Sequence, residues 1–192
     1  MTQERALEIF SRAGVLQEGH FRLTSGRHSG RYLQCAKIFR QPKYSEELCS
    51  ALAEGFRDRG VEIVIGPAMG AVQMAYEVSR ALRCENFFTE RGGDGKMCLR
   101  RGFEVRPGQK VLVVEDVVTT GGSVREVMEI VRAAGGEVVG VGSLVDRTGG
   151  KIGFGVPFRS VVSMEIESWA PEDCPLCKAG APAPVKPGSR KI

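Results

Sequence analysis

The chain has 192 residues, of which 42% are hydrophobic and 26% charged, and its formal net charge is +4. This composition excludes a chain that is mainly disordered, and no apolar run approaches the roughly 20 residues that a membrane span requires. At about 100–200 residues per domain, the length predicts one domain over residues 1–192, large enough to bury a core.

The excess positive charge lies at the C-terminal end, because residues 178–192 contain four of the 27 basic residues and no acidic one. Without these four, 23 basic residues face 23 acidic ones, so the charge is weak evidence for nucleic-acid binding, and we expect neither a nucleic-acid partner nor a membrane partner. Residues 1–10 lack the apolar stretch and cleavage site of a signal peptide, so we expect a cytoplasmic protein.

Apolar spacing predicts the first elements in chain order. A helix is expected over residues 3–13, and residues 20–39 are typical of a hairpin with little strand. A second helix is expected over residues 45–59, ended by Gly60, and a short buried strand over 61–65.

The middle of the chain alternates in the same way. We expect a helix at about residues 71–82, a strand at 85–89, and a long mobile loop over the polar, glycine-rich residues 90–102.

The last elements are apolar strands at residues 110–115, 137–146 and 159–164, with a helix over about 123–134 between the first two. Short apolar strands that alternate with helices predict an α/β fold with a parallel sheet covered on both faces. The final residues are expected to form an extended arm.

The six cysteines are expected to be reduced, since no export signal is present. Cys174 and Cys177 form the single closely spaced pair, and three interpretations stay open: structural thiols, part of a metal site, or a redox pair. A structural zinc site needs four ligands, and no second close Cys or His pair accompanies this one. We expect His20 and His28 to be surface or turn residues rather than general bases.

One segment carries the chemistry: residues 111–123, VLVVEDVVTTGGS. A buried strand ends in Glu115 and Asp116, and a Thr/Gly/Ser turn then leads into a helix. Ligands bind beyond the carboxyl ends of strands in open α/β sheets, and free amides at a helix N-terminus favour a phosphate. The two carboxylates would accept hydrogen bonds from sugar hydroxyls or help to hold a divalent cation. The segment therefore predicts a site for a ribose phosphate, and it is neither a Walker A loop nor a dinucleotide fingerprint.

This segment resembles the phosphoribosyl-diphosphate (PRPP) motif of the type I phosphoribosyltransferases. Its flanks are similar to the orotate phosphoribosyltransferase family: FRLTSGRHSGRYLQC at residues 21–35, GPAMGAVQMAYEVSRAL at 66–82, FTER at 88–91 and LVDR at 144–147. The tail, CPLCKAGAPAPVKPGSR, resembles a bacterial subgroup of that family. The likeness covers about residues 1–190.

The resemblance implies the type I phosphoribosyltransferase fold: a central, mostly parallel sheet flanked by helices, with a small hood and a flexible lid loop. It places the N-terminal hood segment at about residues 1–40, the lid at about 91–101 and the C-terminal arm at about 171–192. It also implies a homodimer in which the lid of each subunit reaches the site of the other.

The implied reaction transfers ribose 5-phosphate from PRPP to N1 of orotate, giving orotidine 5′-monophosphate and diphosphate in pyrimidine biosynthesis. Mg²⁺ would be the cofactor, carried mainly by the diphosphate with no direct protein ligand. The transition state has oxocarbenium character, so positioning and charge neutralisation would supply the catalysis.

The resemblance also assigns roles to residues. Catalytic roles fall on Asp116, Lys96 and Arg91. Orotate would be bound by Thr119, Arg147, Tyr32 and Leu33, although Arg147 could instead pair with Asp146, and Tyr32 and Leu33 could be plain core. The residues implied to bind PRPP are Glu115, Asp116, Val117, Val118, Thr119, Thr120, Gly121, Gly122, Ser123, Arg91, Met69 and Gly70.

The sequence departs from better-known members of the family, which carry a lysine where this chain has Thr24 and another where it has Gly70. Its lid reads GGDGKMCLRRG, without histidine. Lys96 is the lysine of this lid and is our candidate for delivering charge, with Arg100 and Arg101 as rivals that could instead anchor the base of the loop.

Two other functions stay open. A purine phosphoribosyltransferase would share the PRPP loop, but Arg147 suits an acidic base such as orotate better. A PRPP-sensing regulator that binds nucleic acid would need a basic face, and outside the tail the charges balance.

Overall fold

The computed structural model describes residues 1–23 and 25–187, and its centre is a six-stranded sheet of order β5-β4-β3-β6-β7-β8. Every neighbouring pair is parallel except β4 and β5, which are antiparallel. The expected α/β fold with a mostly parallel sheet is therefore confirmed. The strands are β3 (Ile63–Pro67), β4 (Glu85–Arg91), β5 (Met97–Leu99), β6 (Lys110–Val118), β7 (Glu137–Asp146) and β8 (Phe158–Ser163).

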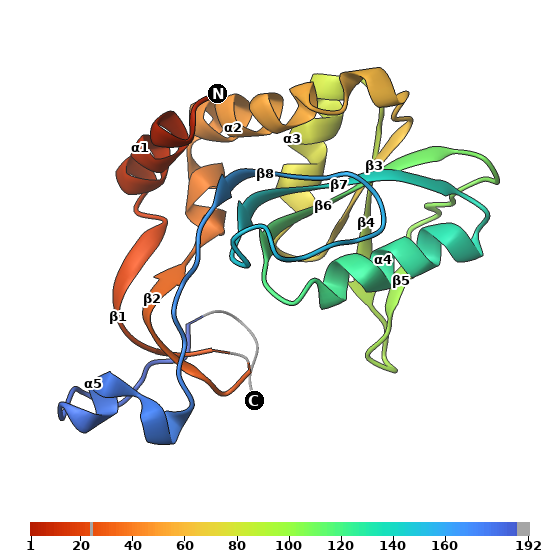
Figure 1. Ribbon diagram of the computed structural model, residues 1–192. Helices are drawn as coiled ribbons and strands as arrows, with labels where there is room; N and C mark the ends of the chain where they lie inside the picture. Colours follow the sequence, from red (N-terminus) through yellow and green to blue (C-terminus); the bar gives the residue numbers. More distant parts are fainter. Residues whose placement is uncertain (24, 188–192) are drawn as a thin grey trace.

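Helices cover both faces of this sheet, as Figure 1 shows. Helices α2 (Pro42–Glu54) and α3 (Val72–Leu82) lie on one face, and α4 (Gly122–Ala133) lies on the other. Short 3-10 turns η1 (Cys35–Arg40) and η2 (Arg57–Arg59) flank α2. Within the described residues, no helix combines the length and apolar character needed to cross a membrane.

The core consists of two apolar clusters, one on each face of the sheet, and β6 contributes to both. Leu112 and Val114 pack with residues of α2 and α3, whereas Val111 and Val113 pack with α4. All four side chains are fully buried, as expected for a central strand of a parallel sheet. Burial of each side chain stabilises the fold by about 1.5–3 kcal/mol, so the position of β6 is strongly fixed.

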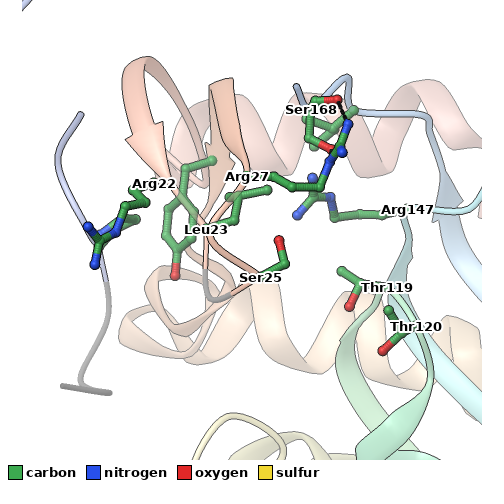
Figure 2. Close-up of a pocket in the computed structure, with 11 residues that line it drawn as sticks. Arg22, Leu23, Ser25, Arg27, Thr119, Thr120, Arg147 and Ser168 are labelled. Carbon is green, nitrogen blue, oxygen red and sulfur yellow. Dashed lines mark hydrogen bonds between the residues drawn. The ribbon is translucent and has the colours of Figure 1, made fainter. Parts of the chain in front are cut away.

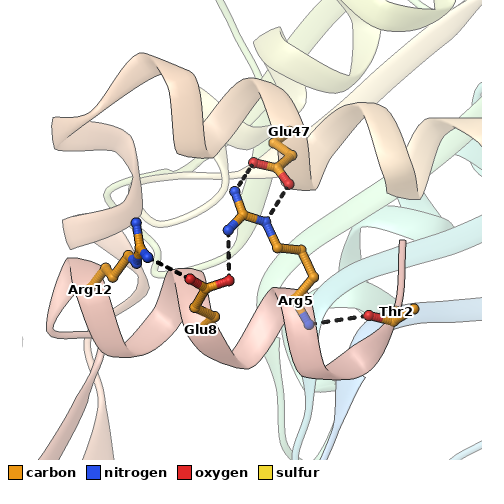
Figure 3. A network of polar contacts seen from close by, with 5 residues as sticks. All are labelled: Thr2, Arg5, Glu8, Arg12 and Glu47. Atoms are coloured by element: carbon orange, nitrogen blue, oxygen red, sulfur yellow. Dashed lines mark hydrogen bonds and ion pairs between the residues drawn. The ribbon is translucent and has the colours of Figure 1, made fainter.

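Helix α1 (Gln3–Ala13) contacts α2 through an ion pair, shown in Figure 3. The Thr2 hydroxyl caps the helix by accepting a hydrogen bond from the Arg5 backbone N–H, and Gly14 ends it in the left-handed conformation. The Arg5 guanidinium donates to both carboxylate oxygens of Glu47 in α2, at 2.8 and 2.9 Å. This pair is largely exposed and adds little stability, and α1 is positioned mainly by the burial of Ala6, Ile9 and Phe10 in the core.

An antiparallel hairpin stands apart from the main sheet, formed by β1 (Leu16–Arg22) and β2 (His28–Leu33). The C-terminal segment, with η3 (Pro171–Asp173) and α5 (Pro175–Lys178), lies beside it (Figure 1). The expected hairpin is confirmed, but it contains more strand than the sequence suggested. His28 lies within β2 and is only 6% exposed, so our expectation of a surface or turn position is wrong for it, whereas His20 lies in β1 and is partly exposed.

The helix expected over residues 45–59 ends earlier, at Glu54. Phe56 leaves the helical path and is buried in the core, and a separate turn then runs to Gly60, whose φ is +64°. The burial of one aromatic ring therefore overrides the helical propensity of the sequence.

The loop expected over residues 90–102 is partly regular. Strand β4 continues to Arg91, and the chain turns back through Gly95, at φ +77°, into β5. Met97 is buried at the start of β5, which supplies the apolar anchor for this short strand. The expected lid is thus a β-hairpin whose turn spans residues 92–96.

Gly140 in β7 permits the close packing of Phe56, which follows α2, onto the sheet. A Cβ atom at Gly140 would lie 2.5 Å from Cε1 of Phe56 and 3.3 Å from the Pro157 carbonyl oxygen. We expect Gly140→Ala to destabilise the fold by about 1–3 kcal/mol, because the buried ring has to move. Urea unfolding monitored by circular dichroism measures this loss. Gly153→Ala is the matched control, since a Cβ at Gly153 meets no atom within 4 Å; equal stability of the two variants would contradict the prediction.

Candidate active site

The carboxyl end of β6 leads directly into a turn that opens α4. Gly121 takes the N-cap position with φ +73°, and a Cβ there would lie 2.7 Å from Cδ1 of Ile152 and 2.8 Å from Cε1 of Phe154. Both the backbone conformation and the space therefore require glycine. The first amides of α4 have no partners within the helix, and together with the helix dipole they favour an anion.

A cavity of about 430 Å³ lies over this turn. Its lining offers backbone amides, hydroxyls and one arginine beside carboxylates. These groups are typical of a site for a phosphorylated sugar. Its lining consists of Ser25, Arg91, Glu115, Val117, Val118, Thr119, Thr120, Gly121, Gly122, Ser123, Val124 and Glu126. Eight of the nine residues between 115 and 123 that are implied to bind PRPP are thus brought together with Arg91. The remaining one of that run, Asp116, lies beside this cavity.

Arg91 reaches this cavity from β4 and is held there by an acid of α4. Its two terminal nitrogens lie 3.1 Å from the two carboxylate oxygens of Glu126, and one of them also donates to the Gly95 carbonyl at 2.6 Å. The side chains of this pair are 38% and 39% exposed, so an arriving phosphate can compete with Glu126 for the guanidinium.

Asp116 lies against the loop that follows β3. A Cβ at Gly70 would lie 2.9 Å from both Asp116 carboxylate oxygens, so glycine permits the backbone to approach the acid. Burial raises the pKa of Asp116 above its usual range, and hydrogen bonds with Glu115 and the Val117 N–H offset part of this shift. The Ala68–Met69 peptide bond in the same loop is cis, and Met69 is 83% exposed.

A second cavity, of about 410 Å³, adjoins the first and shares Ser25, Thr119 and Thr120 with it (Figure 2). It lies between the hood and the carboxyl ends of β6 and β7. Its other lining residues are Arg22, Leu23, Arg27, Tyr32, Arg147, Ile166, Ser168 and Pro187. Three arginines in one small cavity predict an anionic occupant.

Arg147 has no partner for its buried Nε atom within the described residues. Burial lowers the pKa of this guanidinium, and the nearby Tyr32 offsets part of that effect. An unsatisfied buried donor costs about 1–3 kcal/mol, so the arrangement favours an acceptor in the cavity.

The alternative that Arg147 pairs with Asp146 is wrong. Asp146 is 1% exposed and turns the other way: its Oδ1 accepts from the Thr148 N–H at 2.8 Å and hydroxyl at 2.7 Å, and its Oδ2 accepts from the Gly150 N–H at 2.7 Å. Burial by itself would raise the pKa of Asp146, but these hydrogen bonds, with one from Ser163, hold it below its usual range. Asp146 thus shapes the turn after β7 and leaves Arg147 free.

The remaining sequence candidates lie outside the two cavities. Leu33 is 6% exposed and packs in the core, which favours the plain-core alternative, and its contact with orotate stays a prediction. Its neighbour Tyr32 does line the second cavity. Lys96 lies exposed in the turn of the β4–β5 hairpin. Arg101 donates to both oxygens of Glu90, at 2.8 and 3.1 Å, which anchors the base of that hairpin. Thr24 lies outside the described residues.

Several lining residues were missed by the sequence analysis. Arg22, Ser25 and Arg27 belong to the quoted segment FRLTSGR, so the motif contained the signal but no role was assigned to them. Arg27 donates to the hydroxyl and to the carbonyl of Ser168, which joins the hairpin to the C-terminal segment (Figure 2). Nothing in the local sequence marks Ser168, because only the tertiary fold brings it to the cavity.

Comparison with known proteins places this geometry in a family. Residues 36–163 match the model of the phosphoribosyl transferase domain. Orotate phosphoribosyltransferase of Heliobacterium modesticaldum is 58% identical over 193 residues, covering 99% of this chain and 100% of the relative. The enzyme of the same name from Caldanaerobacter subterraneus subsp. tengcongensis is 57% identical over 192 residues, covering 100% of both chains.

A solved structure agrees with this similarity. Mycobacterium tuberculosis H37Rv orotate phosphoribosyltransferase, in complex with Fe(III) dicitrate, superposes with a TM-score of 0.71 at 30% identity. The match covers 84% of this chain and 96% of that chain.

The turn built on Asp146 makes a prediction about stability. Asp146→Asn loses an acceptor for the Gly150 N–H and should lower the free energy of unfolding at pH 7 by about 1–3 kcal/mol. Because the folded pKa of Asp146 is depressed, its contribution is present above its unfolded pKa of about 4 and is lost as the pH falls through the folded pKa. The difference between wild type and variant should therefore shrink at pH 3.

Urea unfolding at pH 7 and pH 3 measures both effects, and Asp58→Asn, at an exposed position, is the control. A difference that is as large at pH 3 as at pH 7 would show that the carboxylate charge is not what stabilises the turn.

Proposed function

The chain belongs to the phosphoribosyltransferase family, and we propose that it transfers ribose 5-phosphate from PRPP to N1 of orotate. The bond from the anomeric carbon to the diphosphate oxygen breaks, the bond to orotate N1 forms, and orotidine 5′-monophosphate and diphosphate are released. The chain thus acts as an orotate phosphoribosyltransferase, a pentosyltransferase of pyrimidine biosynthesis. The support is similarity of more than half of all positions to curated enzymes of this name over the full chain.

The observation that carries the choice of base is the partly buried Arg147 in the second cavity, whose Nε has no hydrogen-bond partner among residues 1–23 and 25–187. Orotate bears a carboxylate, and a guanidinium can bind a carboxylate through two parallel hydrogen bonds. Tyr32 lies in the same cavity and offers a ring face for the pyrimidine. A neutral purine would leave Arg147 without its ionic partner, so this cavity favours orotate over hypoxanthine or adenine.

The two cavities place the substrates on either side of Thr119 and Thr120. The amides and hydroxyls of the turn bind the 5′-phosphate of PRPP, and Glu115 and Asp116 accept hydrogen bonds from the ribose hydroxyls. With both substrates held, the reaction needs no protein nucleophile, because positive charge at the anomeric carbon is met by positioned dipoles and carboxylates.

Mg²⁺ is the proposed cofactor, and the residues fit it. The Asp116 carboxylate lies next to Gly70 and offers oxygen atoms of the type Mg²⁺ prefers beside the proposed diphosphate position. The ion would be held mainly by the diphosphate, whose negative charge it neutralises. Asp116 and Glu115 would orient the sugar around it.

The β4–β5 hairpin is the proposed lid. Arg91 at its base and Lys96 in its turn would neutralise the leaving diphosphate, and closure would exclude water, a competing nucleophile. We place the enzyme in the cytoplasm as a homodimer in which each hairpin serves the partner's site. This arrangement requires Arg91 to leave Glu126 and the cavity of its own chain.

The deciding test is an absorbance assay for the disappearance of orotate with PRPP and Mg²⁺. We expect turnover that requires all three, together with thermal stabilisation by orotate and none by hypoxanthine. Turnover of hypoxanthine instead of orotate would establish the purine alternative, and tight salt-sensitive RNA binding without any turnover would establish the regulator.

Arg147 makes the sharpest site prediction. Arg147→Ala should lower kcat/KM for orotate by about 10²–10³-fold while KM for PRPP stays within about twofold, because only the orotate carboxylate loses its partner. Arg147→Lys should recover only part of this loss, since an ammonium lacks the planar fork. Arg59→Ala, at an exposed position, is the control; an equal effect of Arg147→Ala on KM for both substrates would contradict the assignment.

The shared lid predicts complementation between inactive subunits. Mixing Arg91→Ala or Lys96→Ala chains with Asp116→Ala chains should restore up to about a quarter of wild-type activity, since half of the dimers are mixed and each carries one intact site. Steady-state rates before and after subunit exchange measure the recovery. No recovery, with mixed dimers shown by native mass spectrometry, would mean that each hairpin serves its own subunit.

A further inference from the structure

Four side chains that can ligate a metal converge where the C-terminal segment crosses the β1–β2 hairpin. They are His20 of β1, His28 of β2, and Cys174 and Cys177 at the start and within α5, and their ligand atoms all lie within 4.8 Å of one another. We propose that these residues form a structural Zn²⁺ site that fastens the C-terminal segment to the hood.

The distances between the ligand atoms fit a tetrahedral Zn²⁺ site. With Zn–N of about 2.05 Å and Zn–S of about 2.3 Å, a tetrahedron separates two nitrogens by about 3.3 Å and a nitrogen from a sulfur by about 3.6 Å. Here Nε2 of His20 and Nδ1 of His28 are 3.2 Å apart. Three of the four nitrogen–sulfur distances are 3.5 Å from Cys174 to His20, 3.7 Å from Cys177 to His20 and 3.4 Å from Cys177 to His28, and the fourth is at most 4.8 Å.

The surroundings of His20 prepare it to act as a ligand. Its Nδ1 lies 2.8 Å from the Pro182 carbonyl oxygen, a contact that places the ring proton on Nδ1. Nε2 then carries a free lone pair and faces the other three groups. A backbone carbonyl that orients the far nitrogen of a histidine is the usual support of a metal ligand.

The backbone of the hairpin holds the same residues in place. His28 and Trp169 exchange two backbone hydrogen bonds of 2.8 Å, and the His20 carbonyl accepts from the Val185 N–H at 2.8 Å. Both histidines are therefore positioned by main-chain pairing with the segment that carries the cysteines. This pairing reduces the conformational entropy lost when an ion binds.

The C-terminal segment has little else to hold it. Among residues 163–187, Cys174 is the single buried side chain, so this segment has almost no apolar core of its own. Its contacts with the hairpin are hydrogen bonds, each of which contributes about 0.5–1.5 kcal/mol, and the side chains of Leu176 and Trp169, which lie next to Gly30. A metal bridge is the means by which short segments with small cores are commonly fixed.

The character of the four ligands defines the role of the ion. Two thiolates and two imidazoles favour Zn²⁺ over the hard cation proposed for the active site, and four protein ligands leave no open position for a substrate. The site is therefore structural. It also bears on the second cavity, because the segment it fastens supplies Ile166, Ser168 and Pro187 to that lining.

The test begins with the full-length chain, without an affinity tag and purified without chelators. Inductively coupled plasma mass spectrometry should find about one zinc per chain, and Cys177→Ser, Cys174→Ser and His20→Gln should each reduce this at least tenfold. Cys84→Ser is the matched control, because Cys84 is a half-buried thiol at the end of α3, on another part of the fold, and should retain the zinc.

A spectroscopic measurement covers the case in which a variant folds poorly. Wild-type protein stripped of zinc and titrated with Co²⁺ should develop the intense visible bands and sulfur charge-transfer absorption of tetrahedral cobalt, saturating at one equivalent. Stripping should also lower the melting temperature, and zinc should restore it. Wild-type protein with reduced cysteines that holds no zinc and gives no tetrahedral cobalt spectrum would overturn the proposal, as would an intact mass showing a Cys174–Cys177 disulfide in its place.

One further measurement rests on the proposed function. Removal of zinc should raise KM for orotate more than KM for PRPP. A chain that binds one zinc but shows no transferase activity would refute the proposed function and leave the zinc site standing. A chain that is active, with its orotate KM unchanged by complete stripping, would overturn the link between the ion and the cavity.

Discussion

The burial of β6 between β3 and β7 is the constraint on which the candidate site depends. Four consecutive apolar side chains fix this strand against both helical layers, and the acids and the turn follow with no intervening loop. The register with β7 pairs Val118 with Asp146, so the next residues, Thr119 and Arg147, emerge side by side at the sheet edge. The two cavities are neighbours because two parallel strands end at the same level.

The arginines around the cavities differ in how they are held. Arg91 is paired with an acid and Arg27 with Ser168, so each has a defined position before a ligand arrives. Arg147 is held by burial, since Asp146 is occupied by the turn that follows it. An anion that enters the second cavity therefore meets one cation whose bonding is incomplete. The free energy gained when the anion completes the hydrogen bonding of Arg147 contributes to binding.

Local sequence patterns predicted the elements that are determined by residues close together in the chain. Spacing, glycine and capping predicted the helix over 3–13, the strand over 137–146 and the phosphate turn at 119–123. The structure confirms the expected bounds of the helix and of the strand. The end of α2, the strand in the expected lid and the core position of Leu33 depend on where Phe56, Met97 and Leu33 become buried. Such burial is decided by partners far along the chain and has no local signal.

The same lack of a local signal explains why the sequence did not place the two histidines beside the cysteines. Cysteines three residues apart are visible in a sequence, whereas His20 and His28 approach them only because two strands pair and the C-terminal segment returns to them. The binding roles of Lys96, Met69 and Gly70 stay predictions, since they concern groups that come together only around the substrates.

The position of the β4–β5 hairpin at the border of the sheet has a mechanical consequence. Strand β5 is three residues long, pairs with one neighbour and is the outermost member of its sheet. Peeling it away would break a single short ladder and leave every parallel pair intact. The tip that carries Lys96 is therefore free to change position without disturbing the strands that hold Asp116 and Arg147.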